Sequence, residues 1–122
     1  MVDFTEISPG DKAELAVDVT EKLVADFAAY SGDFNPLHMN RNFAGKTKFK
    51  RPVAHGLSYA SLFSRLVGMK LPGPGALWLS QDFSFKKPVC IGDKLTLLSE
   101  VIEKNTSTRT LRLKCTAKNQ YG

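Results

Sequence analysis

The stretch "GLSYASLFSRLVGM", residues 56–69, decides how the rest of the chain has to be arranged. Its apolar side chains are spread around a helix rather than along one stripe, and small residues between them allow neighbours to approach closely. This pattern predicts a buried central helix. The following "LPGPG", residues 71–75, ends the helix because it is rich in proline and glycine.

Strand patterns lie on both sides of this helix. Residues 12–19, "KAELAVDV", alternate between apolar and polar side chains before it. Three more runs with the same alternation follow it, at 76–86, 94–101 and 108–118, and the turns between them are short. Short turns favour an antiparallel meander. We therefore predict an α+β fold in which a curved antiparallel sheet wraps around one central helix.

A second helix is predicted between Thr20 and Gly32. Thr20 is a suitable N-cap, Glu21 suits the first turn, and an apolar stripe follows. Gly32 has the character of a left-handed C-cap that ends the helix. Asp33 is therefore expected just past a helix end, in irregular backbone.

The segment "YSGDFNPLHMN", residues 30–40, places an acid and a histidine close together. Asp33 and His38 are five residues apart, and Pro36 between them fixes its own φ and keeps Asn35 out of the helical region. Both side chains can then face one cavity as an acid–base pair. The alternative is that Asp33 and Asn35 make local turn hydrogen bonds and His38 is structural, which the spacing alone favours.

A second segment, "RPVAHG" at residues 51–56, shifts the interpretation from a structural role for Asp33 and His38 toward an acid–base pair. It leads through His55 into Gly56 at the start of the central helix, where an unpaired N–H can stabilise developing negative charge. For His55 we expect a packing or hydrogen-bonding role. For Gly56 the alternative is mere entry into the helix.

Length and composition indicate a single globular domain over residues 1–122. Hydrophobic residues make up 43% of the chain and charged residues 24%, and a chain of 122 residues can bury roughly two thirds of its unfolded surface. The two cysteines lack the spacing of a zinc site or a disulfide scaffold. The sequence contains neither a secretory signal nor an apolar run long enough for a membrane span, so a cytoplasmic location is expected, or an organelle if a transit peptide has been removed.

The formal net charge of +5 favours anionic partners without specifying which. No RNA-binding aromatic signature, zinc finger or recognition-helix pattern is recognisable, so we expect no nucleic acid and consider an anionic small ligand instead. The densest basic run is "KTKFKR", residues 46–51, which is either a ligand-phosphate contact or a solvated face.

Taken together, "YSGDFNPLHMN", "FKRPVAHGLSYASLFSRLVG" and "FSFKKPVCIGDKL" resemble the MaoC-like, (R)-specific enoyl-CoA hydratases of the hot-dog fold, across essentially the whole chain. The resemblance implies a catalytic pair of Asp33 and His38, with the Gly56 amide as oxyanion donor. It implies that Asn35 and Ser64 support the site.

Substrate contacts follow from the same resemblance. Leu57 is expected to line the acyl pocket, and four basic residues are candidates to hold the anionic handle of the thioester: Lys46, Lys48, Lys50 and Arg51. The resemblance implies reversible hydration of a trans-2-enoyl thioester to the (R)-3-hydroxyacyl thioester, without a metal or redox cofactor. It also implies a homodimer that binds acyl-CoA or acyl-carrier-protein thioesters.

Several alternatives remain at this point. One is dehydration of 3-hydroxyacyl carrier protein in fatty-acid synthesis; another is a non-catalytic acyl-thioester-binding domain, which would need neither Asp33 nor His38. A thioesterase is less favoured, because the central helix carries serines where that class usually has an acid. Relatives of this family normally continue past "NQYG", residues 119–122, so we expect a hot-dog domain that lacks its last C-terminal strand.

Overall fold

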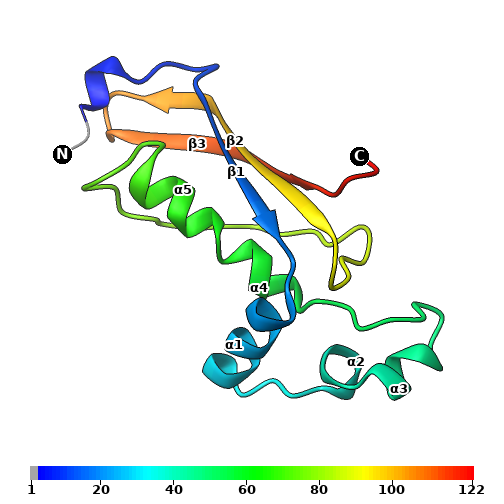
Figure 1. Ribbon diagram of the computed structural model, residues 1–122. Helices are drawn as coiled ribbons and strands as arrows, with labels where there is room; N and C mark the ends of the chain where they lie inside the picture. The colour runs from blue at the N-terminus through cyan, green and yellow to red at the C-terminus, as the bar shows by residue number, and fades with distance from the viewer. Residues whose placement is uncertain (1–2) are drawn as a thin grey trace.

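A computed structural model describes residues 3–122 as a sheet with helices on one side and at one end (Figure 1). Along the chain the elements are η1 (Phe4–Glu6), β1 (Lys12–Asp18), α1 (Glu21–Ser31), α2 (Pro36–Met39), α3 (Arg41–Gly45), α4 (Gly56–Ala60), α5 (Phe63–Met69), β2 (Lys94–Asn105) and β3 (Thr110–Lys118).

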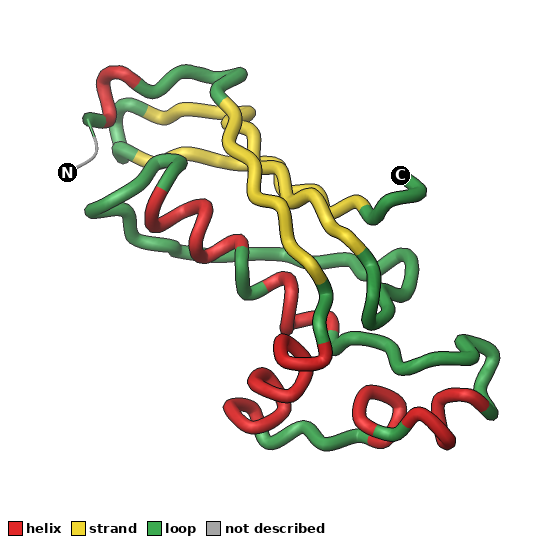
Figure 2. The backbone as a smooth tube through the Cα atoms, viewed as in Figure 1, coloured by secondary structure: helices red, strands yellow, loops and turns green. Residues whose placement is uncertain are grey.

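The sheet is antiparallel with the strand order β1-β2-β3, and it curves over α4 and α5 (Figures 1 and 2). β2 is the middle strand, and its inward side chains Leu95, Leu97 and Val101 are almost fully buried, as their alternation predicted. A register shift between Val101 and Glu103 marks a bulge in β2, which adds local twist to the sheet. The predicted α+β architecture, a curved sheet around a central helix, is confirmed.

The central helix differs from the prediction in two ways. It is divided into α4 and α5 by a turn at residues 61–62, so the region is not one continuous helix. It is also buried on one face only: Tyr59, Phe63 and Leu66 face the core, while Leu57 is 54% exposed. Of the small residues that predicted close packing, Ser58 and Ala60 are buried, whereas Ser61 and Ser64 are exposed.

Helix α1 begins and ends where the sequence predicted. The Thr20 side chain accepts a hydrogen bond from the Leu23 N–H, and Gly32 adopts φ 80° with its N–H donating to the Ala28 carbonyl. Val24 and Ala28 bury the apolar stripe of the helix. The left-handed glycine turns the chain sharply, which places Asp33 outside the helix.

The strand predicted at residues 76–86 is not formed. The segment is extended, but the structure assigns it to no strand. Leu77 and Leu79 are 81% and 71% exposed, whereas Trp78 packs against the core. Alternation indicates extended backbone, but a strand also needs a neighbour to hydrogen-bond with. The predicted meander therefore keeps only the hairpin of β2 and β3, and β1 pairs with the free edge of β2.

The loop before α4 is anchored by the loop before β2. The Val53 and Cys90 backbones form an isolated antiparallel bridge, and the Ala54 N–H donates to the Val89 carbonyl at 2.7 Å. Asp93 is 2% exposed, and its carboxylate accepts from the Cys90 N–H at 2.9 Å and from Arg51 at 3.3 Å. This network fixes the backbone that leads to Gly56. Among residues 3–122, no helix is long and apolar enough to cross a membrane.

Candidate active site

The loop after α1 is shaped by short-range hydrogen bonds. The Asn35 side chain accepts from the Leu37 N–H at 2.9 Å and caps the four-residue helix α2, with Pro36 at its first position. The Asp33 carboxylate accepts from the Asn35 N–H at 3.1 Å. The local turn expected as the alternative reading therefore exists, and it is what presents His38 on the first turn of α2.

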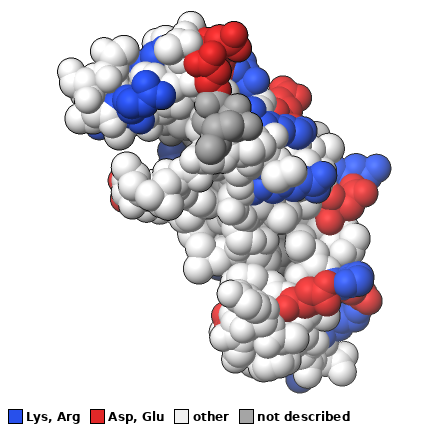
Figure 3. Space-filling model, turned by 90° about the vertical axis from the view of Figure 1, so that its left-hand side faces the viewer, with Lys and Arg blue, Asp and Glu red and all other residues white. Residues whose placement is uncertain are grey.

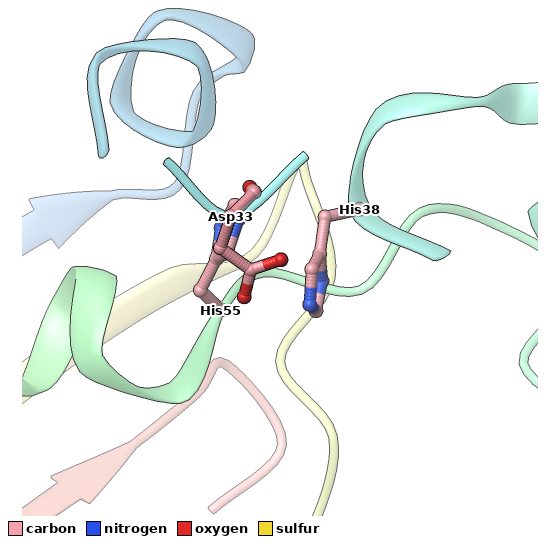
Figure 4. Close-up of side chains that lie close together, drawn as sticks. All are labelled: Asp33, His38 and His55. Atoms are coloured by element: carbon pink, nitrogen blue, oxygen red, sulfur yellow. Dashed lines mark hydrogen bonds between the residues drawn. The ribbon is translucent and has the colours of Figure 1, made fainter. Parts of the chain in front are cut away.

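Two segments distant in sequence meet at this loop. His55, just before α4, is 3% exposed, and its Nε2 lies 2.9 Å from the Asp33 carbonyl oxygen. The rings of His38 and His55 are stacked, with centroids 4.0 Å apart and planes at 29°. A carboxylate oxygen of Asp33 and one ring nitrogen each of His38 and His55 all lie within 4.8 Å of one another. Figure 4 shows the Asp33 carboxylate turned toward the ring of His38.

Backbone carbonyls set the tautomer of both histidines. The Nδ1 of His38 contacts the Val53 carbonyl oxygen, which can only accept, so this nitrogen carries the proton and Nε2 keeps a free lone pair. By the same argument His55 is protonated on Nε2, because this nitrogen donates to the Asp33 carbonyl. His38 therefore offers a basic nitrogen next to the carboxylate of Asp33, which is the arrangement that proton transfer requires.

These side chains border a cavity of about 620 Å³. Its wall includes Asp33, His38, Gly56 and Leu57, four of the residues that the sequence singled out. Its apolar part is lined by Phe27, Phe49, Val53, Tyr59, Phe85 and Val89. A cavity with apolar walls and a few convergent polar groups is typical of a small-molecule site.

Gly56 brings its backbone close to one aromatic wall of the cavity. A methyl group in place of its hydrogen would lie 2.8 Å from Phe85 Cε1, closer than carbon atoms approach. The Gly56 amide is at the first position of α4, so no carbonyl of that helix can accept its hydrogen. The N–H therefore stands next to the cavity at a position where only glycine fits without a shift of Phe85.

The chain was compared with known families and structures. The family model described as "MaoC like domain" matches residues 5–120. The chain belongs to the MaoC-like family.

Two relatives and one solved structure show how close the match is. The chain is 47% identical to an (R)-specific enoyl-CoA hydratase from Aeromonas caviae, over 85% of this chain and 81% of that protein. It is 40% identical to a 3-hydroxybutyryl-CoA dehydratase from Methylorubrum extorquens, over 93% of this chain and 72% of that protein. The structure of an A. caviae (R)-hydratase involved in PHA biosynthesis superposes with a TM-score of 0.94 at 43% identity, over 96% of this chain and 89% of that one. The predicted family and hot-dog fold are confirmed.

In this MaoC-like chain the basic residues predicted to hold the substrate lie outside the cavity wall. Lys46, Lys48 and Lys50 are exposed on the loop after α3, and Arg51 pairs with Asp93. The Lys48 Nζ lies 5.3 Å from the ring centroid of Phe49, which does line the cavity.

Charge is not gathered into one large patch on the face that Figure 3 shows. Lys and Arg side chains there alternate with Asp and Glu in small groups, between large uncharged areas. The net charge of +5 is therefore a weak guide to the substrate-binding residues.

Ser64 and the cavity are also separate. Ser64 is exposed on α5, where its N–H donates to the Ser61 carbonyl, and it is not among the residues of the cavity wall. Its predicted supporting role stays a prediction. The supporting role of Asn35 has a physical basis here, since its side chain caps the helix that carries His38.

Among the residues that border the cavity and that sequence reasoning missed, five bear on charge and shape. Lys86 and Lys87 contribute the positive charge, and Phe85 and Tyr59 pack edge-to-face with ring centroids 6.1 Å apart. Burial raises the pKa of the Tyr59 hydroxyl above its ordinary value. The fifth is Val89. The two lysines are part of the stretch "FSFKKPV", which contributed to the family resemblance. They were not considered there as contacts for an anionic substrate.

A metal ion would not fit the site as it stands. Two imidazoles that bind one ion at ~2.1 Å point their nitrogens toward a common centre. Here the rings of His38 and His55 are stacked 4.0 Å apart, and His55 Nε2 is engaged by the Asp33 carbonyl. The geometry therefore suits acid–base chemistry better than metal binding.

Proposed function

We propose that this protein catalyses the reversible hydration of a trans-2-enoyl thioester to the (R)-3-hydroxyacyl thioester. The observation that carries the proposal is the placement of the Asp33 carboxylate and the free Nε2 of His38 on one cavity wall, beside the Gly56 amide. The relatives named above as hydratase and dehydratase support the same chemistry.

Hydration adds the hydroxyl of a water to the β-carbon and a proton to the α-carbon. Either the Asp33 carboxylate or His38 Nε2 takes a proton from the water as its oxygen attacks, and the pair passes that proton on to the α-carbon. No electron is gained or lost, so the reaction needs no redox partner. The proton taken from the water ends on the α-carbon, so the pair finishes in the state in which it began. One side-chain atom of each group lies within 4.8 Å of the other, close enough to share that proton through one water.

Negative charge gathers on the thioester oxygen while the β-carbon is attacked. The Gly56 N–H can donate to that oxygen, and one such donor is often worth about 3 kcal/mol of barrier. Leu57 and the apolar wall would hold the acyl chain. For the anionic end of the substrate we propose Lys86 and Lys87, with Lys46, Lys48, Lys50 and Arg51 as the earlier candidates on the neighbouring loop.

The test is hydration of crotonyl-CoA, followed as loss of the conjugated absorbance, with chiral analysis of the product. The wild type should form the (R)-alcohol, and Asp33→Asn or His38→Ala should each lower kcat by at least about a hundredfold. Circular dichroism and melting temperature should be unchanged, which separates chemistry from folding. Near-full activity in either folded variant would refute the mechanism, and absence of (R)-product in the wild type would refute the function.

The same site would also dehydrate 3-hydroxyacyl thioesters, because the catalysed equilibrium runs in both directions. Offering the acyl group on coenzyme A and on acyl carrier protein in parallel assays separates the hydratase from the carrier-protein dehydratase. A protein that binds either thioester without turnover would be the non-catalytic binding domain instead. We also propose assembly as a homodimer, which sedimentation velocity can test.

A further inference from the structure

His55 touches both members of the proposed catalytic pair. Its ring stacks on the His38 ring at a centroid distance of 4.0 Å, and its Nε2 donates to the backbone carbonyl of Asp33 at 2.9 Å. Phe27 packs against the ring at 4.8 Å. The backbone of His55 is held as well, since its carbonyl accepts from the Ser58 hydroxyl at 2.6 Å and from the Ser58 N–H at 3.0 Å.

The other ring nitrogen shows that packing alone does not account for a histidine here. His55 Nδ1 is buried and has no hydrogen-bond partner among residues 3–122. A buried acceptor without a partner destabilises a fold, and a phenyl ring of similar size would remove it. What histidine supplies and phenylalanine cannot is the Nε2–H that reaches Asp33.

We propose that His55 is a positioning residue that fixes Asp33 and His38 relative to each other through its Nε2–H and its ring face. The hydrogen bond holds the backbone at Asp33, and the ring face holds the plane of His38. This inference rests on the proposed function, because its effect on rate is expressed through that catalytic pair. It assigns to His55 no proton transfer and no contact with the substrate.

Two substitutions separate the two contacts. His55→Phe keeps the aromatic face toward His38 but removes the donor to Asp33, and His55→Gln can keep a donor at the Nε2 position but removes the ring. Ser58→Ala is the matched control, because Ser58 is equally buried on the first turn of α4 and supports the His55 backbone without touching either catalytic side chain.

The expected kinetics differ from those of a purely structural residue. His55→Phe should melt within a few degrees of the wild type, yet kcat for crotonyl-CoA should fall by about tenfold to a hundredfold, as a misplacement approaching 1 Å does, with KM changed by less than about twofold. His55→Gln should recover part of that loss even if it melts lower. Ser58→Ala should lower the melting temperature and keep kcat within about twofold. A His55→Phe enzyme with kcat within about threefold of the wild type would overturn the proposal.

A double-mutant cycle tests the route of the effect. If His55 acts through Asp33, adding His55→Phe to Asp33→Asn should lower the residual rate by less than about twofold. If the two residues act independently, the rate losses of the two substitutions should multiply. Multiplying effects would overturn the proposal.

A measurement that does not depend on turnover separates a failure of the positioning role of His55 from a failure of the proposed function. Long-range ¹H–¹⁵N spectra of the imidazoles in the wild type should show His55 protonated on Nε2 and His38 on Nδ1 near neutral pH. The opposite tautomer of His55 would overturn the positioning role whatever the activity. A wild type with the expected tautomers and no hydration would refute the proposed function alone. Should His55→Phe fail to fold, the His55→Gln kinetics and these spectra still decide the question.

Discussion

Replacing Gly56 with alanine is the smallest change that tests the oxyanion end of the site. The new Cβ would lie 2.8 Å from Cε1 and 2.9 Å from Cζ of Phe85. Carbon atoms in contact prefer about 3.5 to 4.0 Å, so the ring or the start of α4 has to move by roughly 0.7 Å or more. Both groups line the cavity, so the displacement changes the space in which the thioester oxygen would meet the Gly56 N–H.

The expected cost falls on activity rather than on stability. Misplacement of a reacting group by 1 Å can cost about a hundredfold, so a shift of this size should lower kcat/KM by between about tenfold and a hundredfold. Overpacking costs about 1–3 kcal/mol in a tight core, but Phe85 is 51% exposed and can yield, which places the cost at the low end. Alanine in place of a helical glycine returns roughly 0.5–1 kcal/mol. The two contributions nearly cancel, and the melting temperature should change by only a few degrees.

Crotonyl-CoA kinetics and thermal unfolding measured on the same preparations provide the assay. Phe85→Leu removes the two ring atoms that collide, so the Gly56→Ala/Phe85→Leu pair should recover activity to the level of Phe85→Leu alone. A Gly56→Ala enzyme with kcat/KM within about threefold of the wild type would refute the role given to this backbone. A double variant as impaired as the single one would show that Phe85 is not the cause.

Two further predictions concern charge. Lys86→Glu with Lys87→Glu should raise KM for CoA esters more than it lowers kcat, because a remote contact made equally in ground and transition states affects KM alone; added salt should weaken the effect. The same charge reversal at Lys48 and Lys50 should raise KM less. An equal or larger rise in KM there would place the phosphate contact on that loop instead. Because burial raises the pKa of Tyr59, its contribution to stability is complete below the unfolded pKa near 10 and is lost as the pH rises through the folded pKa. The melting temperature of Tyr59→Phe should therefore decline less than that of the wild type between about pH 9 and 11, and parallel declines would contradict this.

Local signals gave the most reliable sequence predictions. Thr20 and Gly32 mark the ends of α1 because an N-cap and a left-handed C-cap depend only on neighbouring backbone. The Asp33 to His38 loop is likewise built from contacts within a few residues, so its composition indicated its geometry.

Features that depend on distant partners were not predictable in the same way. Nothing in the alternation of residues 76–86 says whether a second strand lies beside them, and here Trp78 rather than Leu77 faces the core. The role proposed for His55 depends on stacking against His38, which lies 17 residues earlier in the sequence. Lys86 and Lys87 reach the cavity because the extended segment runs back past α5 and α4, which only the folded chain reveals.

Segment 76–86 also yields the last prediction. Its extended backbone is paired with no strand among residues 3–122, and β3 is hydrogen-bonded to β2 alone. Unpaired strand edges with exposed apolar side chains such as Leu77 and Leu79 are surfaces to which another strand can add. We expect an alternating apolar–polar strand, fused after Gly122, to pair at one of these edges and to extend the sheet.

Each backbone hydrogen bond gained contributes about 0.5–1.5 kcal/mol, so four or five of them should stabilise the fold by a few kcal/mol after the entropy of ordering the strand. The melting temperature should then rise by roughly 10 °C. The matched control is the same strand with its pattern moved by one residue, which turns every apolar side chain to the opposite face and should give little or no rise. Light scattering on the extended and the unextended protein distinguishes this from pairing between further copies, which would raise the mass above that of the unextended protein. An unchanged melting temperature with the correct pattern, or an equal rise with the shifted one, would show that these edges do not select a strand by its side chains.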